Sequence, residues 1–414
     1  MSRKTAFVGF SYMAGLLLAS FFSAPLSIAI GAVLLGFGLC TVFIFRPKHS
    51  GSFYRSAVCA IACCVGLWIY SGYDMTVCRN ITANIGNFSG AVTIEQSTVY
   101  SEEKAFYIAH CTFPNGASGN VGFFDRRSDL VKGDKITLSG QLYAPENTGF
   151  FNSADHYRSM NVFLLMKSVR TSGYEIKEHN FYRTLDDFRH NVSDTIRKYV
   201  PSEEGELLIG MLFGSSKWNM SDRTENLLYR AGIGHVAAVS GLHMSVAAGI
   251  AAALAIALRL PKWGQFISVT AVSLLFAMTA GFTPSVVRSL IMVMFVWAAG
   301  IFNRRSDSLT SLAAAIIIMT ISSPFIVRST SFLLSVSGTI GTAVLSPMFI
   351  NAYEKKMERK TDLPYHVGAL TSALCSSLCA AASVFPVSAL TFDQISIALS
   401  LIHISEPTRP ISIS

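Results

Sequence analysis

The segment HVAAVSGLHMSV, residues 235–246, is apolar enough to enter a membrane, yet it carries His235, Ser240 and His243. Ser240 and His243 are three residues apart, so a helix would place them on one face, with His235 near that face. A histidine at membrane depth costs free energy unless it faces a cavity, a partner or water. Gly241 weakens a helix by about 1 kcal/mol relative to Ala. The pattern predicts a broken helix whose unwound backbone lines a pore or binding site; the alternative is that the histidines only cap or pack near the membrane interface.

A second polar feature lies in GFTPSVVRSL, residues 281–290. Thr283 is expected to cap a helix that begins at Pro284, a favoured first residue, with Ser285 in its first turn. Arg288 then lies one turn inside a stretch that otherwise lacks charge. An arginine beside a helix N-terminus attracts anions such as phosphate or carboxylate. The alternative is an arginine that snorkels to the membrane interface.

Catalysis by these residues has little support in the sequence. A serine hydrolase built on Ser240 and His243 needs a carboxylate to orient the histidine, and no acidic residue lies in the nearby apolar spans. The chain has no HExxH motif, CxxC pair or EF-hand loop, and His235 and His243 lack the i, i+4 spacing of a helical zinc pair. We therefore expect no enzyme, no catalytic residue, no metal site and no cofactor.

The composition indicates a polytopic α-helical membrane protein with one polar insert. The 414 residues are 51% hydrophobic and only 14% charged, whereas soluble domains carry about 25% charged residues. The net charge of +8 could point to nucleic acid, but residues 72–204 hold 14 Lys/Arg against 16 Asp/Glu. The basic excess therefore belongs to the membrane part, where topology alone can explain it.

The apolar runs predict helices that cross the membrane, at about residues 5–22, 27–45, 57–72, 236–258, 266–281, 284–302, 308–327, 331–350 and 367–390. The first two form a helical hairpin rather than a cleaved signal peptide, because no soluble domain begins between them. With the N-terminus in the cytoplasm, the basic loops after residues 45, 258, 302 and 352 fall inside, as the positive-inside rule requires. Arg328 is the exception, because it falls in an external loop.

The insert has the alternation of a β-domain and is expected outside the cytoplasm. Strand-length segments lie at residues 91–100, 105–113, 135–143 and 161–169, and a tight turn is expected at Gly133-Asp134. Four or five short strands in about 100 residues fit a small barrel such as an OB-fold. Cys78 and Cys111 both lie here, so an oxidising compartment would permit one disulfide between them. Residues 184–199 then turn helical, and Ser202 is expected to cap a short amphipathic helix at the membrane interface.

Three motifs, AGIGHVAAVSGLHMSV, AGFTPSVVRSLIMVMF and FNRRSDSLTSLAAA, together resemble the competence domain of ComEC-type DNA-uptake proteins. KGDKITLSGQL and NTGFFNSADHYRSMNVF are similar to the external OB-type domain of that family. The resemblance covers about residues 50–395. It divides the chain into a three-helix membrane segment (1–73), an extracytoplasmic OB-like domain (74–182), an amphipathic connector (183–234), a competence-type bundle (235–392) and an irregular tail (393–414).

The resemblance implies a channel component that brings single-stranded DNA across the bacterial cytoplasmic membrane during natural transformation. His235, Ser240, Gly241, His243, Thr283, Pro284, Ser285 and Arg288 would then line or gate the path, with Arg288 countering phosphate charge. Expected partners are single-stranded DNA and the lipid bilayer, with a DNA receptor, further copies of the chain and a separate ATP-driven motor as further candidates. The motor would be another protein because the chain has no Walker-type loop.

Two departures from the family accompany this resemblance. The insert is nearly neutral, unlike the basic grooves that track single strands of nucleic acid, so tight DNA binding there is not expected. The chain also ends in SIALSLIHISEPTRPISIS, where longer relatives continue into further helices and many add a metallo-β-lactamase-like hydrolase domain. We expect a truncated or misassembled reading frame. The alternative functions are a membrane-embedded hydrolase that uses His243 and a transporter of solutes or envelope glycans.

Overall fold

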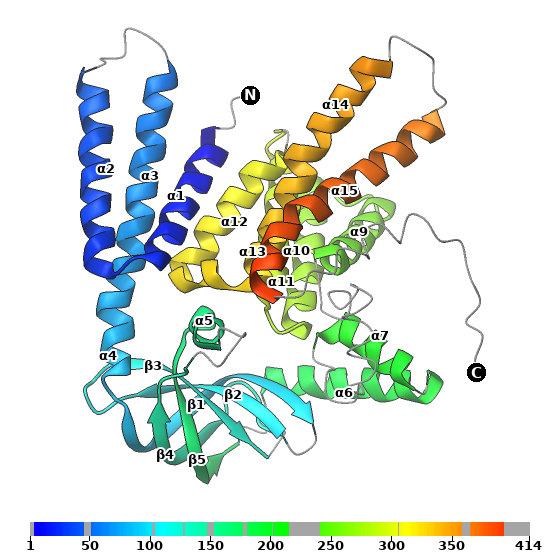
Figure 1. Cartoon of the computed structure of the whole chain (residues 1–414). Coiled ribbons are helices and arrows are strands. Elements are labelled where there is room, and N and C mark those ends of the chain that lie inside the picture. The colour runs from blue at the N-terminus through cyan, green and yellow to red at the C-terminus, as the bar shows by residue number, and fades with distance from the viewer. Residues whose placement is uncertain are drawn as a thin grey trace, which may run out of the picture.

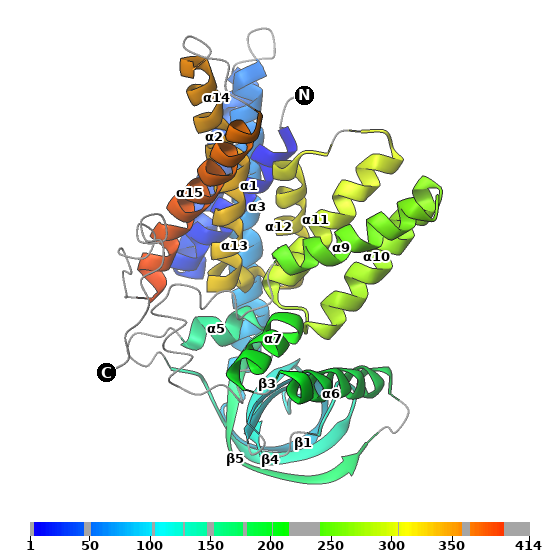
Figure 2. The same ribbon diagram turned by 90° about the vertical axis from the view of Figure 1, so that its right-hand side faces the viewer.

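The computed structural model of the chain describes residues 4–44, 51–101, 104–126, 129–146, 153–176, 180–200, 202–214, 241–304, 306–357 and 365–392. Most of these residues are helical, and a small five-stranded barrel lies at one end of the helices (Figure 1). A view at right angles shows α6 and α7 between the barrel and the helices α9 to α11 (Figure 2).

Three helices precede the barrel: α1 (Lys4–Phe21), α2 (Ala24–Ile44) and α3 (Gly51–Tyr73). The third does not end at the expected boundary near residue 74. It continues through a π-helical turn, η1 (Asp74–Cys78), into α4 (Arg79–Thr82), because no glycine or proline interrupts the chain between Gly72 and Gly86. The barrel therefore stands directly on the end of a long helix.

The helices after residue 240 follow the expected apolar runs, and α9 to α12 are α9 (Gly241–Ala257), α10 (Lys262–Thr279), α11 (Pro284–Ile301) and α12 (Ser308–Ser322). The run expected at 308–327 ends early, because Pro324 lacks the backbone N–H that a continuing helix needs. A short 3₁₀ helix, η4 (Pro324–Arg328), follows. The last helices are α13 (Thr330–Ile340), a π-helical turn η5 (Gly341–Leu345), α14 (Ser346–Met357) and α15 (Tyr365–Phe392).

Within the described residues, four helical stretches are long and apolar enough to cross a membrane: Arg55–Thr82, Pro284–Ile301, Thr330–Ala352 and Thr371–Leu390. Shorter apolar helices cover Thr5–Phe21, Ala24–Gly36, Gly241–Ala257 and Ser308–Ser322. The stretches expose many large apolar side chains, as helices that face lipid do. The chain is thus mostly helical, with several helices suited to a membrane.

The barrel consists of β1 (Gly86–Ser101), β2 (Lys104–Thr112), β3 (Ser118–Asp125), β4 (Lys135–Tyr143) and β5 (Val162–Glu175). Its strands follow the closed order β1-β2-β3-β5-β4, and β4 returns to β1 with Val92 opposite Ile136. Only the β3–β5 pairing is parallel. The helix α5 (Ser153–Ser159) lies between β4 and β5 in the sequence. Closure pairs every strand on both sides and so leaves no free sheet edge.

One strand, β3, was not among the strand segments predicted from the sequence, because its glycines lower its β-propensity. The close packing of the barrel requires at least one of them. A side chain at Gly122 would meet Leu165 Cδ2 and Phe106 Cζ at 2.7 Å. The expected turn at Gly133-Asp134 is present: Gly133 has a φ of +96°, and the buried Asp134 carboxylate accepts a hydrogen bond from the Val131 N–H at 3.0 Å.

The connector holds α6 (Phe181–Tyr199) and α7 (Glu203–Phe213). Arg197 on α6 donates two hydrogen bonds to the Glu206 carboxylate on α7, at 2.7 and 3.3 Å, and these bonds raise the pKa of the Arg197 guanidinium. Ser202 occupies the N-cap position of α7, but the expected capping bond is absent, because its hydroxyl bonds the Glu204 carboxylate instead of a backbone N–H.

Candidate functional site: a buried arginine in the helical bundle

The site is built on α11, whose start agrees with the sequence pattern. Thr283 is the N-cap residue and Pro284 the first helical residue. Thr283 makes no side-chain capping bond, and its buried Oγ1 has no hydrogen-bond partner among the described residues. Arg288 follows one turn later and is 8% exposed, between the buried side chains Val286 and Leu290. It therefore does not snorkel to solvent.

The Arg288 guanidinium is only partly satisfied by its surroundings. Its Nη1 donates to Thr339 Oγ1 of α13 at 2.7 Å and lies 3.4 Å from Met292 Sδ. Its Nε is buried and has no partner, and no carboxylate in the described ranges pairs with it. A guanidinium carries five N–H donors and a full positive charge, so this arrangement leaves donors and charge available to an anion.

Hydroxyl groups from two helices, α11 and α13, lie near the arginine. Ser285 Oγ lies 3.4 Å from Ser335 Oγ of α13, and Ser289 Oγ donates to the Ser285 carbonyl at 2.8 Å. Together with Thr339 they form a polar cluster between α11 and α13 that we call the Arg288 cluster: Arg288, Ser285, Ser289, Ser335 and Thr339. Hydroxyls can donate to or accept from a passing polar group without adding charge.

Helix α9 approaches this cluster at Gly241. A Cβ at position 241 would lie 2.6 Å from Ser289 Oγ and 3.3 Å from Arg288 Nη2. Glycine therefore lets the first turn of α9 lie directly against the guanidinium. Of the expected pathway residues, Gly241, Ser285 and Arg288 thus lie where α11 meets α9 and α13, whereas Thr283 and Pro284 begin α11.

Comparison with protein families assigns this part of the chain. Residues 211–404 match the family model described as Competence protein. The chain carries a Competence domain. The match is consistent with the resemblance to ComEC-type competence proteins, and the whole Arg288 cluster lies inside it. Neither the curated proteins nor the solved structures searched contain a match to the chain.

The Competence domain supports a role in DNA uptake during competence. Together with the apolar helices it indicates a membrane-embedded protein. Within the described residues of the domain and the rest of the chain, no three His, Cys, Asp or Glu side chains gather as metal ligands would.

The structure describes only some of the other expected pathway residues of the Competence domain. His235 and Ser240 lie outside the described residues, and so does half of the expected helix break at Ser240-Gly241. Gly241 is the first residue of α9, and His243 is half-buried on its first turn. The role of His243 therefore stays a prediction.

Ser289, Ser335 and Thr339 of the Competence domain were missed by reasoning from the sequence. Ser335 and Thr339 are four residues apart in an apolar helix, and this spacing puts both hydroxyls on one face. The signal was present, but serine and threonine also occur in membrane helices as ordinary packing residues, so only their contact with α11 distinguishes them.

The two cysteines of the barrel region, outside the Competence domain, are separate free thiols, so the structure does not contain the possible Cys78–Cys111 disulfide. Cys111 is buried in the barrel, and burial raises the pKa of its thiol to about 12. Its Sγ donates a weak hydrogen bond to the Gly119 carbonyl at 3.6 Å. A thiol with so little thiolate at neutral pH oxidises slowly.

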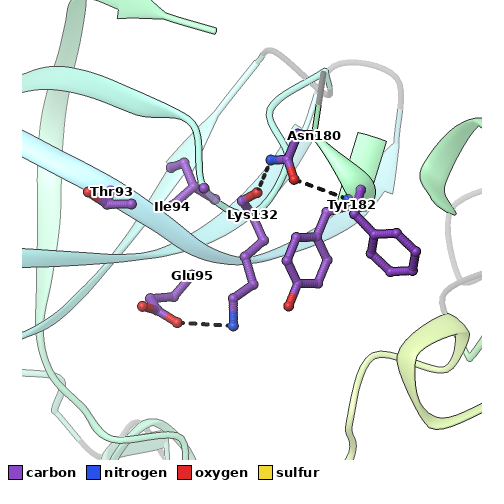
Figure 3. Close-up of a pocket in the computed structure, with 8 residues that line it drawn as sticks. Thr93, Ile94, Glu95, Lys132, Asn180 and Tyr182 are labelled. Atoms are coloured by element: carbon purple, nitrogen blue, oxygen red, sulfur yellow. Dashed lines mark hydrogen bonds and ion pairs between the residues drawn. The ribbon is translucent and has the colours of Figure 1, made fainter. Parts of the chain in front are cut away.

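An open hollow of about 300 Å³ lies where the barrel meets α6 (Figure 3). Lys132 Nζ reaches Glu95 Oε2 at 3.4 Å and lies 5.5 Å from the centre of the Tyr182 ring. Asn180 bridges the two parts, because its Oδ1 caps α6 through the Tyr182 N–H while its Nδ2 donates to the Lys132 carbonyl. These bonds join the connector to the barrel.

Proposed function

We propose that this protein is a channel component that moves single-stranded DNA across the bacterial cytoplasmic membrane during natural transformation. The observation that carries the proposal is the Arg288 cluster. It is a buried cation with a free donor, set among hydroxyls inside a Competence domain. Single-stranded DNA carries one negative charge per nucleotide, and a phosphate inside the hydrocarbon needs a compensating partner.

The chemistry of the cluster fits a pathway better than a reaction centre. An arginine can pair with a phosphate through two parallel hydrogen bonds. Neighbouring hydroxyls can hydrogen-bond the DNA strand without adding positive charge, so the strand is bound weakly enough to move on. We assign Gly241, Ser285 and Arg288 to the path, with His235, Ser240, His243, Thr283 and Pro284 as further lining or gating residues. Transport, rather than catalysis, is the activity proposed for them, without a metal or cofactor.

The barrel fits an OB-like extracytoplasmic domain that meets incoming DNA or a DNA receptor. Its support is the closed order of five short strands and its position at one end of the helices. The N-terminus would lie in the cytoplasm and the helices would cross the membrane several times. A cytoplasmic ATP-driven motor would supply the energy, and several copies of the chain could share one pore.

The test is DNA uptake by a deletion strain that is complemented with full-length variants. Arg288→Met removes the charge at similar length, Arg288→Lys keeps it, and Arg304→Met removes an exposed arginine as a matched control. We expect DNase-protected label to fall tenfold or more with Arg288→Met, about the effect of losing one hydrogen bond to a charged group. Arg288→Lys should retain part of the uptake and Arg304→Met all of it.

Surface-bound, DNase-sensitive label should stay unchanged in every strain, because the proposal places the block at the membrane. Normal uptake in the deletion strain would refute the proposal. Equal losses with Arg288→Met and Arg304→Met would show that the Arg288 cluster has no special part in transport.

A further inference from the structure

The barrel and the Competence domain meet at η4, the short 3₁₀ helix between α12 and α13. Asp155 on α5 of the barrel and Arg328 on η4 form an ion pair, with Oδ2 and Nη2 2.6 Å apart. The Asp155 side chain is 10% exposed and that of Arg328 29% exposed. Coulomb attraction between two charges is screened less where burial excludes water, so this pair is stronger than one on an open surface.

Aromatic packing holds the same junction. Phe325 on η4 is 1% exposed, and its ring lies 4.9 Å from Tyr70 and 5.7 Å from Tyr73, both on α3. The Phe163 ring of β5 lies 5.7 Å away on the barrel side. The four rings and the ion pair together fix η4 between the barrel, α3 and α5.

The junction leads directly to the Arg288 cluster. Helix α13 begins at Thr330, two residues after Arg328, and carries Ser335 and Thr339. Thr339 accepts the hydrogen bond from Arg288, and Ser335 contacts Ser285. A shift of η4 therefore moves the helix that supplies half of the hydroxyls around the arginine.

We propose that Asp155 and Arg328 are positioning residues: their ion pair sets where α13 lies against α11, and through it the contacts of Arg288. The barrel thereby holds the Arg288 cluster in its working geometry, and a partner that displaces α5 would alter that cluster. The transport consequence rests on the proposed function, whereas the positioning of α13 does not.

Disulfide cross-linking measures the position of α13 without any transport assay. Ser285 Oγ and Ser335 Oγ are 3.4 Å apart, so the double change Ser285→Cys/Ser335→Cys should oxidise readily to a disulfide in the full-length protein. Mass spectrometry of the linked peptides gives the yield. We expect Asp155→Asn and Arg328→Gln each to lower that yield severalfold, because either change removes the charge attraction that holds η4 against α5. Arg328→Lys keeps the charge and should preserve most of the cross-link.

Glu95→Gln is the matched control, because it breaks the exposed Glu95–Lys132 pair on the same barrel and should leave the yield unchanged. DNA uptake is measured in parallel in strains with Ser285 and Ser335 intact. Uptake should fall with Asp155→Asn, and it should be largely retained with Arg328→Lys, which keeps the charge. Membrane yield of each variant is compared, and Arg328→Lys keeps the test valid if Arg328→Gln is poorly produced.

An unchanged cross-link with both Asp155→Asn and Arg328→Gln would overturn the inference. A loss equal to that of Glu95→Gln would do the same, because it would show a general effect of barrel charge. A lower cross-link with normal DNA uptake would support the positioning of α13 and contradict the transport role of the Arg288 cluster, so the two proposals fail separately.

Discussion

At the scale of single residues, the site depends on the small residue Gly241 as much as on the charged residue Arg288. Arg288 can lie inside the bundle because Thr339 accepts one of its hydrogen bonds, and because Gly241 leaves room for its guanidinium. An arginine in a membrane interior is costly, and such residues are usually functional. The cost is offset here by hydroxyls and by close helix contact, which also keep the charge available.

Gly241→Ala should destabilise the protein, whereas Gly249→Ala on the same helix should not. The new methyl at 241 would meet Ser289 Oγ at 2.6 Å, which forces the hydroxyl off the Ser285 carbonyl or separates α9 from α11. We expect a loss of about 1–3 kcal/mol in the free energy of unfolding, as for other overpacked sites. Position 249 has open space around it and can gain up to about 1 kcal/mol from helix propensity.

Thermal unfolding of the full chain in detergent would measure both changes. The matched pair removes the general effect of adding a methyl group to α9. Equal unfolding temperatures for the two variants would show that α9 does not pack on the Arg288 cluster.

At the scale of elements, ion pairs with different degrees of burial lie in the barrel and at its joint with α6. Asp134 at the β3–β4 turn is fully buried and accepts a hydrogen bond from Arg183 Nη2 of α6 at 2.9 Å. The Glu95–Lys132 pair, drawn in Figure 3, leaves both side chains more than two-fifths exposed. Burial should make the first pair essential to the joint between barrel and connector and the second dispensable.

Arg183→Met should cost about 3–5 kcal/mol in the free energy of unfolding, because it removes the guanidinium that pairs with the fully buried Asp134 carboxylate. Glu95→Gln should cost no more than about 1 kcal/mol, as exposed pairs do. Denaturant unfolding of the full-length protein, followed by tryptophan fluorescence and far-UV circular dichroism, gives both values. Similar costs for the two changes would mean that burial does not decide the strength of these joints.

At the scale of the whole molecule, the structure explains why Arg328 is an exception to the positive-inside rule. The sequence places this arginine in an external loop, against the positive-inside tendency. In the structure it is neutralised by Asp155 of the barrel, so it serves as a contact between domains rather than a topology signal. Figures 1 and 2 place the barrel at the opposite end of the bundle from the last residues of α14.

The proposed topology predicts which exposed positions a membrane-impermeant maleimide can reach in spheroplasts. Ser97→Cys on the barrel should be labelled in intact spheroplasts, and Ser306→Cys between α11 and α12 only after permeabilisation. Labelling of both positions after permeabilisation is the control for reactivity. The reverse pattern would invert the orientation, and equal labelling of both in sealed spheroplasts would exclude a membrane between them.

The sequence alone determined the apolar helices, most of the barrel strands and the helix start at Pro284, because local periodicity and a favoured first residue specify them. It also singled out Arg288, because a charge in an apolar helix is costly. The tertiary structure decided the rest. β3 needs its partners to define it, since its glycines are unfavourable for a strand on their own. Thr339 lies 51 residues from Arg288, and Asp155 and Arg328 belong to different parts of the chain. The spacing of Ser335 and Thr339 puts both hydroxyls on one helix face, but neither this spacing nor a single charged residue identifies the partner, because only folding brings the partner side chains together.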